Sequence, residues 1–239
     1  MIIEGRNAVR EALASGVTVE KILVAKGAEG SVSVLVAQAK QAGVRVVFAD
    51  KSALDRVSVT KHHQGVLAYT TEFDYCTLED ILASKRGEHH FILLLDEIED
   101  PHNLGSIIRV ADVLGVDGIV IPSRRGATVN ETVVRTSAGA TAYVKIAKVG
   151  NINDAIRALK EEFVTVYALD MDGEEIASSR LDCDLALVVG NEGKGVKALT
   201  RKLCDGAVSI PQSGHIDSLN ASVATGIAVY EVVRQRRER

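Results

Sequence analysis

Short apolar runs alternate with stretches of helical spacing along this chain, which is the pattern of an α/β protein. In the first 71 residues the pattern predicts strands at 19–24, 44–48 and 66–69. Helices are predicted around them, at 7–13, 31–42 and 52–57. These elements predict a small α/β domain formed by residues 1–71.

A second, larger series of the same kind begins at residue 91. Its apolar runs are almost continuous and predict parallel strands covered on both faces, at 91–95, 118–121, 143–147, 165–169, 185–189 and 207–210. Helices are predicted at 104–114, 131–135, 152–162, 196–203 and 220–236. The polar stretch 72–90, with one short helix predicted at 78–83, indicates a linker. We therefore expect a domain at 1–71, a linker at 72–90 and a second domain at 91–239.

The composition is that of an ordinary soluble globular protein, with 46% hydrophobic and 25% charged residues. No apolar run approaches the roughly 20 residues that a membrane-spanning helix needs, and the first residues lack the order of a signal peptide. The expectation is a cytoplasmic protein. Three widely spaced cysteines, and histidine pairs without a plausible set of further ligands, indicate neither a disulfide framework nor a metal site.

Charge is distributed unevenly along the chain. Residues 1–71 carry nine Lys and Arg against six Asp and Glu, whereas the remaining residues carry 19 against 26. An acidic total argues against a sequence-independent coat for nucleic acid, yet it allows an RNA enzyme that concentrates positive charge on one face. Candidate RNA contacts, each alternatively a solvated surface charge, are Arg6, Arg10, Arg124, Arg125, Arg234, Arg236, Arg237 and Arg239.

Open parallel sheets bind ligands beyond the carboxyl ends of their strands, so the turns that follow the strands are the candidate sites. The first turn, at 96–103, leads into a helix for which Asn103 is the predicted N-cap. Arg109 then falls on the helix stripe that faces away from the sheet. Two roles are open for Arg109: a solvated pair with Asp112, or a clamp on a phosphate or ribose.

Two further turns carry candidate chemistry. The turn at 190–195, GNEGKG, has three glycines in six residues, which lets the backbone approach a ligand and expose its amides. Its spacing is that of neither a P-loop nor a dinucleotide-binding fingerprint. The turn at 210–222 crowds hydroxyl and amide side chains at a helix start. There, free backbone amides hold a polar ligand group, or Ser218 or Asn220 caps the helix.

Taken together and in order, these turns resemble the three motifs of the SpoU (TrmH-like) RNA ribose 2'-O-methyltransferases of the SPOUT superfamily. The matching segments are NLGSIIR at 103–109, GNEGKG at 190–195, and IP at 210–211 followed by SLNASVA at 218–224. The resemblance covers about residues 91–236. Residues 1–71, with GRNAV at 5–9 and HQGV at 63–66, are similar to the substrate-binding domain of the bacterial 23S rRNA guanosine ribose methyltransferases.

The resemblance implies a C-terminal α/β domain tied into a deep trefoil knot, which sequence reasoning would not propose because connections normally do not thread loops. It implies that S-adenosylmethionine (AdoMet) sits bent in the knot, with its adenosine held by the backbone of Gly190, Ile210 and Leu219. It also implies a homodimer whose active site is completed across the interface. The last helix, with apolar residues at 223, 227, 229 and 232, supplies either that interface or core.

The implied reaction is methyl transfer from AdoMet to the ribose 2'-hydroxyl of a guanosine in 23S rRNA. A hydroxyl is a poor nucleophile, so the site must remove its proton or align it with the methyl group. The matching polar positions are Asn103, Arg109, Glu192, Ser218 and Asn220. Relatives cast the arginine as general base, but a guanidinium has a pKa above about 12, so binding of the target phosphate is equally open. Glu192 would be the base if it lies within about 3.2 Å of the hydroxyl.

Three alternatives stay open at this point. The first keeps the reaction but moves it to tRNA or to another rRNA nucleotide. The second is a non-enzymatic RNA-binding protein, in which eroded polar positions are expected, whereas here they are intact. The third, a nucleotide-binding oxidoreductase, would need a glycine fingerprint and a ribose-binding acid after the first strand, and the chain has neither.

Overall fold

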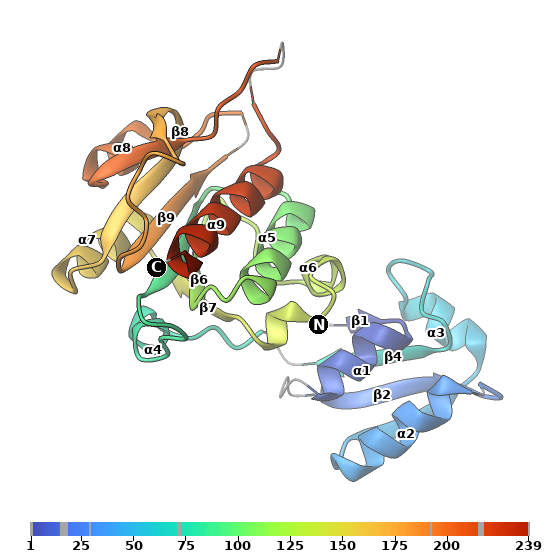
Figure 1. The fold of residues 1–239 in the computed structure, drawn as a ribbon. Helices are drawn as coiled ribbons and strands as arrows, with labels where there is room; N and C mark the ends of the chain where they lie inside the picture. The colour runs from blue at the N-terminus through green and yellow to red at the C-terminus, as the bar shows by residue number, and fades with distance from the viewer. Residues whose placement is uncertain are drawn as a thin grey trace. The chain divides into compact units, whose positions relative to one another are not determined.

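The computed structural model describes residues 2–14, 19–28, 30–70, 73–191, 193–214 and 218–238. The chain divides into two compact units (Figure 1). The first unit comprises residues 1–74 and 129–143, and the second comprises 75–128 and 144–239. Each unit is a sheet covered by helices, so the predicted α/β class is confirmed. No helix among the described residues is long and apolar enough to cross a membrane.

The first unit is built on a four-stranded sheet with the order β1-β4-β2-β3. The strands are β1 (Ile2–Glu4), β2 (Val19–Ala25), β3 (Arg45–Ala49) and β4 (Val66–Thr70). β2 pairs parallel with β3, whereas β4 pairs antiparallel with β1 and β2. The helical segments of this unit are α1 (Arg6–Ala14), α2 (Ser31–Gln41), α3 (Lys51–Val57), α6 (Glu131–Thr136) and η1 (Ala140–Ala142).

The second unit is built on a six-stranded sheet with the order β10-β8-β9-β5-β6-β7, and every pairing is parallel. Its strands are β5 (Phe91–Asp96), β6 (Gly118–Pro122), β7 (Lys145–Val149), β8 (Thr165–Glu175), β9 (Leu185–Gly190) and β10 (Gly206–Ser209). All six residues of β5 are buried, as expected for a strand covered on both faces.

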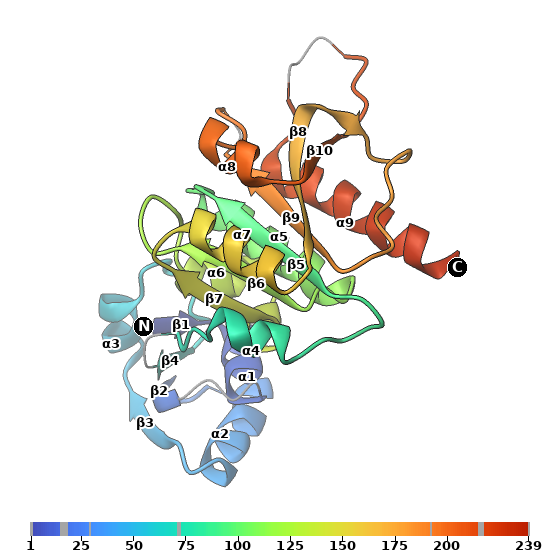
Figure 2. The same cartoon turned by 90° about the vertical axis from the view of Figure 1, so that its left-hand side faces the viewer.

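Helices cover both faces of this sheet (Figure 2). They are α4 (Leu78–Leu82), α5 (Pro101–Val113), α7 (Ile152–Glu161), α8 (Ala198–Leu203) and α9 (Ala221–Arg237). α7 packs on the face that carries Ile92, Leu94 and Val188, in one core cluster. α5 and α9 pack against each other and contact β6 and β9.

The connection between β8 and β9 crosses the carboxyl end of α9. Gln235 Nε2 donates to the carbonyl oxygens of Ile176 and Ser179, and the Leu181 amide donates to Gln235 Oε1 at 3.1 Å. The Arg236 guanidinium donates to the carbonyl oxygens of His89, His90 and Cys183 at 3.1, 2.7 and 2.6 Å. Arg236 is therefore engaged within the fold, contrary to its expected role as an RNA contact, and Arg239 lies outside the described residues.

Every predicted helix and strand is present, but some ends differ. β8 runs to Glu175, beyond the predicted end at 169, and the short strand β1 was not predicted. The prediction that Asn103 caps α5 is wrong. The helix begins at Pro101, and Asp100 Oδ1 accepts the His102 amide at 2.9 Å. Proline lacks an N–H and has a helical φ, so it suits the first helical position, which places Asn103 inside the first turn.

The predicted boundaries at 71 and 90 stay an expectation. Within 73–90, α4 begins at a capping box formed by Thr77 and Asp80, and Cys76 forms an isolated β-bridge with Ala147. Residues 75–90 therefore belong to the second unit, and α6 and η1 belong to the first unit although they lie far along the chain.

Candidate active site

A cavity of about 380 Å³ opens at the carboxyl ends of β8, β9 and β10. Its lining comes from three segments: 169–171 in the middle of β8, where its pairing with β9 ends, 189–195 at the end of β9 and in the loop after it, and 210–224 from the end of β10 into α9. This is where an open parallel sheet binds its ligands, and the volume is typical of a small-molecule site.

The second and third turns predicted from the sequence meet in this cavity. Gly190, Ile210 and Leu219, the predicted cofactor residues, all line it, as does Ser218. Leu169, Asp170 and Met171 also line it and were missed by sequence reasoning. The sequence marks these residues only as the point where the apolar run of a strand ends. The order of the strands, which the sequence does not show, places that point beside β9.

The loop at 190–195 closes on itself. The Gly195 amide donates to the carbonyl oxygen of Asn191 at 2.8 Å, and the Gly193 amide donates to Asn191 Oδ1 at 3.0 Å. A Cβ atom on Gly190 would lie 2.1 Å from the carbonyl carbon of Gly195, so only glycine fits there without a shift of the loop. Glu192, a predicted catalytic residue, lies outside the described residues.

A charged cluster, Asp96, Glu97, Asn191 and Lys197, joins this loop to the end of β5. Lys197 Nζ lies 2.6 Å from Glu97 Oε1 and 3.5 Å from Asp96 Oδ1, and Asn191 Nδ2 donates to the Glu97 carbonyl oxygen at 3.1 Å. The hydrogen bond from Lys197 holds the pKa of Glu97 below its ordinary value. Burial opposes the charge of Lys197, but the bond to Glu97 and the charge of Asp96 leave its pKa raised. We call these four residues the Lys197 cluster.

The backbone at Glu97 has φ 62, a left-handed conformation that is uncommon for residues other than glycine. Such conformations persist only where the surrounding contacts hold them, and here the Glu97 side chain and carbonyl are both bonded to the loop after β9. The cluster therefore fixes the glycine loop against the first turn of the predicted site.

Asn103 and Asn220 also bring separate motifs together. Asn220 Nδ2 donates to Asn103 Oδ1 at 2.9 Å, and Asn103 is buried. Asn220 Oδ1 accepts the amides of Ser222 and Val223, so the prediction that Asn220 can cap the last helix is confirmed. The first turn of α5 is thereby tied to the start of α9.

Arg109 lies apart from these residues, exposed on α5. It follows Asn103 by six positions, which is about 9 Å along a helix. Within the described part of the chain Arg109 neither lines the cavity nor forms a hydrogen bond or ion pair. The predicted pair with Asp112 is absent there, and Asp112 instead lies 3.9 Å from Arg86.

Exposed apolar side chains lie on α5, one turn beyond Arg109, and on α9, which packs against α5. Val113 is 73% exposed, and Val223, Ile227 and Tyr230 are 50%, 41% and 60% exposed. The three residues of α9 follow a spacing of four and three, so they share one face of the helix. Val229 and Val232 are fully buried. Of the four apolar positions predicted for interface or core, two are therefore exposed and two belong to the core.

None of the described residues forms a group of three or more His, Cys, Asp and Glu side chains that could hold a metal ion.

The chain is similar to known RNA methyltransferases along almost its whole length. The family model described as "SpoU rRNA Methylase family" matches residues 90–230, and the one described as "RNA 2'-O ribose methyltransferase substrate binding" matches residues 2–76. YacO of Bacillus subtilis (strain 168), whose name places it among TrmH family tRNA/rRNA methyltransferases, is 39% identical over 236 residues, which is 97% of this chain and 94% of YacO.

Solved structures of RNA methyltransferases also resemble this chain. An AdoMet-bound rRNA methyltransferase from Sinorhizobium meliloti superposes with a TM-score of 0.82 at 28% identity, covering 98% of this chain and 86% of that one. A TrmH/SpoU tRNA modifying enzyme from A. aeolicus superposes with a TM-score of 0.58 at 32% identity, covering 67% of this chain and 81% of its own.

The two family models together account for nearly the whole chain, in the order that the sequence motifs predicted. The predicted cofactor is confirmed at the level of this family, in which a similar methyltransferase has been solved with AdoMet. The trefoil knot is likewise implied by the family. The chain belongs to the SpoU family of RNA ribose 2'-O-methyltransferases.

Proposed function

We propose that this protein methylates the ribose 2'-hydroxyl of a guanosine in 23S rRNA, as a cytoplasmic homodimer that uses AdoMet. The observation that carries the proposal is the cavity itself, in which two of the three family motifs meet after β9 and β10, the two strands on either side of β8. The third motif is bonded to them through Asn103 and Asn220.

The cavity suits AdoMet in its chemistry. Leu169, Val189 and Ile210 provide an apolar wall for an adenine ring, and Gly190 and Leu219 offer backbone groups at turns. Asp170 adds a carboxylate that suits a cationic group of the cofactor. When bound, AdoMet supplies an electrophilic methyl group on a sulfonium.

The polar residues then serve the target ribose. Ser218 lines the cavity, and the Asn103–Asn220 pair lies beside it at the start of α9. We assign Arg109 to the target phosphate, because a guanidinium keeps its proton in proteins and forms paired hydrogen bonds to phosphate oxygens. Glu192, in the same loop as Gly190, is the proposed proton acceptor, because a carboxylate can take a hydroxyl proton at hydrogen-bond distance.

A dimer explains the position of Arg109. This side chain is exposed and lies outside the cavity lining of its own chain, one helical turn from the exposed Val113 on α5, and α5 packs against α9, which exposes Ile227 and Tyr230. An exposed apolar surface of this kind marks a protein interface. If the same surface pairs on two copies, Arg109 of one protomer can complete the site of the other.

An rRNA target is favoured by the extent of the structural matches. The Sinorhizobium meliloti rRNA methyltransferase matches 98% of this chain, whereas the A. aeolicus tRNA modifying enzyme matches 67%. The first unit, which matches the substrate-binding model, is thus part of the resemblance to the rRNA enzyme.

The experiment is methyl transfer from labelled AdoMet to separated, unmodified 23S rRNA, 16S rRNA and tRNA, followed by nucleoside analysis. We expect label in 2'-O-methylguanosine from 23S rRNA. Label in tRNA would keep the reaction and overturn the substrate. Binding of AdoMet and RNA without transfer to any of the three would support the non-enzymatic alternative.

A further inference from the structure

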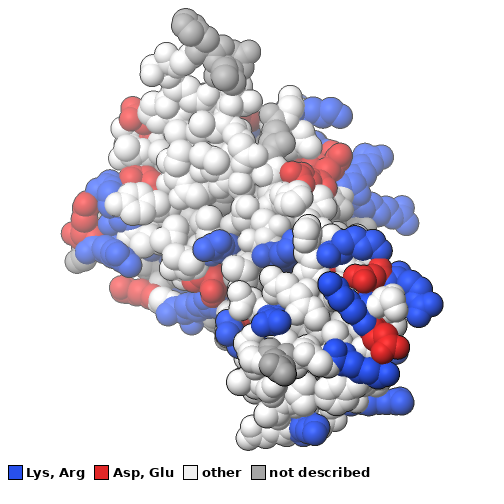
Figure 3. Space-filling model, turned by 90° about the vertical axis from the view of Figure 1, so that its right-hand side faces the viewer, with Lys and Arg blue, Asp and Glu red and all other residues white. Residues whose placement is uncertain are grey.

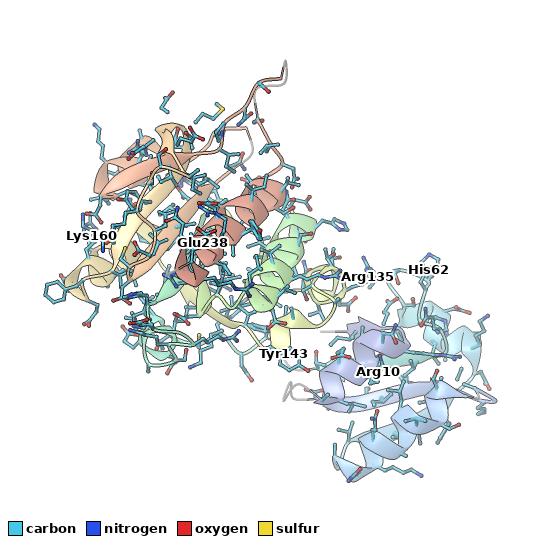
Figure 4. The ribbon with its side chains drawn as sticks, viewed as in Figure 1. Arg10, His62, Arg135, Tyr143, Lys160 and Glu238 are labelled. Atoms are coloured by element: carbon cyan, nitrogen blue, oxygen red, sulfur yellow. The ribbon has the colours of Figure 1, made fainter. Side chains whose placement is uncertain are left out.

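The segment at 129–143, which contains α6 and η1, belongs to the first unit, although both of its ends continue into strands of the second. The chain enters it from β6 at 128–129 and returns to β7 after 143. Arg135 lies on α6, and Tyr143 follows η1 (Figure 4). We call this segment the connector. Because the chain is continuous, any shift of the connector also acts on the residues after β6.

The residues just before the connector are fixed against the turn that follows β5. The Ala127 amide donates to the Ile98 carbonyl oxygen at 2.7 Å, and Arg125 Nη1 lies 3.9 Å from Glu97 Oε1. The carbonyl oxygen of the same Glu97 accepts a hydrogen bond from Asn191, in the loop that lines the cofactor cavity. The start of the connector is therefore joined to the cofactor loop by contacts within the second unit.

In the first unit the connector is bonded to β1 and packed on α1. The Glu131 carboxyl group, at the start of α6, accepts a hydrogen bond from the backbone amide of Ile2. Further along, Gly139 has φ 91, and a Cβ there would lie 2.9 Å from the Cβ of Glu11 on α1. Only glycine fits this position without a shift. The connector thus contacts both of the elements with which the first unit begins.

Strand β1 is in turn bonded to the loop between α3 and β4. The Glu4 carboxylate accepts hydrogen bonds from Ser58 Oγ at 2.9 Å and from the amides of Val59 and Thr60 at 2.5 and 3.3 Å. The Lys61 amide donates to the same Ser58 Oγ at 2.9 Å. One carboxylate of β1 therefore organises the loop at 58–65.

This loop lies in the part of the chain that the family model for RNA substrate binding matches, residues 2–76. With Arg6 and Lys51, residues 61–65 line an open cavity of about 710 Å³. Lys and Arg side chains are gathered on this face of the unit (Figure 3). Positive charge suits the phosphate groups of RNA. We therefore take the loop at 58–65 as the RNA end of a series of contacts whose other end is the cofactor loop.

Left-handed backbone conformations mark the same segments. Six described residues other than glycine have φ between 52 and 62, and all of them except Phe163 lie in the segments just described: Lys61, Gln64, Glu97, Arg125 and Ala138. Such conformations are costly for these residue types, persist only where contacts hold them, and are concentrated at ligand clamps and switch regions. These segments are thus held by their contacts, and a ligand that strengthens the contacts at one end stabilises the whole series.

We propose that the connector couples the two binding sites, so that RNA bound to the first unit tightens AdoMet binding in the second. AdoMet then tightens RNA binding by the same factor, because coupling between two binding equilibria is reciprocal. The inference rests on the proposed function for the identity of the two ligands. The coupling favours the complex that holds both substrates over the complexes that hold one.

The test variant is the double substitution Arg125→Asn and Glu131→Ala. Asn tolerates the left-handed backbone at 125 but removes the ion pair with the turn after β5, and Ala at 131 removes the bond to β1. The matched control is Arg124→Asn with Glu79→Ala. It removes the same charges from an exposed arginine of the same loop and from the first turn of α4, so direct effects of charge on RNA binding are equal.

The full-length proteins are titrated with S-adenosylhomocysteine, the product of methyl transfer, which cannot turn over. Calorimetry gives its affinity without RNA and with saturating in vitro transcribed 23S rRNA or tRNA, and the reverse titration gives RNA affinity with and without it. In the unaltered protein and the control, we expect each ligand to tighten the other at least about fivefold. In the test variant the affinity for S-adenosylhomocysteine alone should be unchanged and the coupling should fall to within about twofold of none.

Affinities that are independent of the second ligand in the unaltered protein would overturn the proposal. Coupling that survives in the test variant would overturn it too, as would an equal loss in the control. If the double variant does not fold, Arg125→Asn against Arg124→Asn gives the same comparison. Coupling with tRNA in place of 23S rRNA would keep this inference and change the proposed substrate, whereas binding of both ligands without coupling would leave the proposed function standing.

Discussion

Asn220 Nδ2 lies 2.9 Å from Asn103 Oδ1, although 117 positions separate the two residues in the chain. The carbonyl oxygen of the same Asn220 side chain caps α9 by accepting the amides of Ser222 and Val223. One side chain thus fixes the start of α9, which lines the cofactor cavity, and ties it to the first turn of α5.

Replacement of Asn220 by Ser separates these two roles. Serine caps helices as well as asparagine does, but it is shorter and lacks the amide donor. We expect the free energy of unfolding of Asn220→Ser to lie within about 1 kcal/mol of that of the unaltered protein. Its kcat should fall at least about tenfold, a loss of about 1.4 kcal/mol in transition-state stabilisation. Asn220→Ala should additionally lose about 1–3 kcal/mol of stability. Denaturant titration and single-turnover assays check both, and normal turnover of Asn220→Ser would refute the role of the pair.

Gly190 tests the cofactor cavity. A Cβ atom there would lie 2.1 Å from the Gly195 carbonyl carbon, so Gly190→Ala must displace the loop. We expect AdoMet affinity, measured by calorimetry, to fall at least about tenfold, which is about 1.4 kcal/mol. Gly214→Ala is the control, because a Cβ there meets nothing within 4 Å. Similar affinities for the two variants would contradict the assignment of this cavity to AdoMet.

Substitution of Lys197 should also weaken AdoMet binding, because the Lys197 cluster holds the loop after β9 in position. Lys197→Met leaves Asp96, which is 4% exposed, and Glu97 without their shared cation. Because the Lys197 side chain is 46% exposed, we expect a modest cost of about 1 kcal/mol and a weakening of AdoMet binding of about fivefold. Lys197→Arg should restore most of the binding, and Lys202→Met, on an exposed lysine of α8, should have no effect.

The cluster also predicts a pH dependence. The pKa of Glu97 is lowered in the folded state, so its contribution to stability is present above the ordinary value of 4.5 and is lost as pH falls through the folded value. AdoMet binding should therefore be constant from pH 6 upward and weaken in acid, and Glu97→Gln should flatten the acid limb. An identical pH profile for Glu97→Gln would contradict this.

Substitution of Arg109 tests whether the active site is shared between protomers, because two different variants can complement each other in a heterodimer. Arg109→Ala should abolish methyl transfer while AdoMet affinity stays within a few-fold. A purified heterodimer of Arg109→Ala with Gly190→Ala contains one site with an intact cavity and the partner's intact arginine. If the arginine acts across the interface, this heterodimer should recover about half of the unaltered activity. An inactive heterodimer would show that Arg109 serves its own chain.

Glu131 gives the first unit its own pH dependence. Burial raises the pKa of this half-buried carboxyl to about 7, and the charge of Glu4 adds to the shift. A raised folded pKa means that the contribution to stability is greatest below 4.5 and is lost as pH rises through about 7. We expect the melting temperature to fall by a few degrees between pH 5 and 8, and to fall less in Glu131→Gln. Parallel melting curves for the two proteins would contradict this.

The strands of the second unit could be predicted because their apolar runs are buried on both faces. The apolar runs Phe91 to Leu95 and Leu185 to Val189 identify their strands without knowledge of the neighbouring strands, so the start of the turn after each could be predicted. Ile210 and Leu219 followed from the same argument together with the family resemblance, and both line the cavity.

What escaped prediction depends on pairing between distant segments. Met171 and Asp170 enter the cavity because β8 lies beside β9, and no local pattern reports strand order. β1 is three residues long and exists through its pairing with β4. Asn103 was predicted to cap α5 from its position at a helix start. The helix instead begins at Pro101 with Asp100 as its cap, and Asn103 Oδ1 accepts the hydrogen bond from Asn220 Nδ2.

The crossing of α9 by the β8–β9 connection bears on how the enzyme is made. Gln235 and Arg236 hold the end of α9 to residues of that connection and to His89 and His90 before β5, while the start of α9 supplies Ala221 and Ala224 to the cofactor cavity. During synthesis all the strands of the larger sheet leave the ribosome before α9 does. A chain interrupted ahead of residue 221 would have both sheets and no complete cofactor site, so catalytic competence arrives only once α9 has been made.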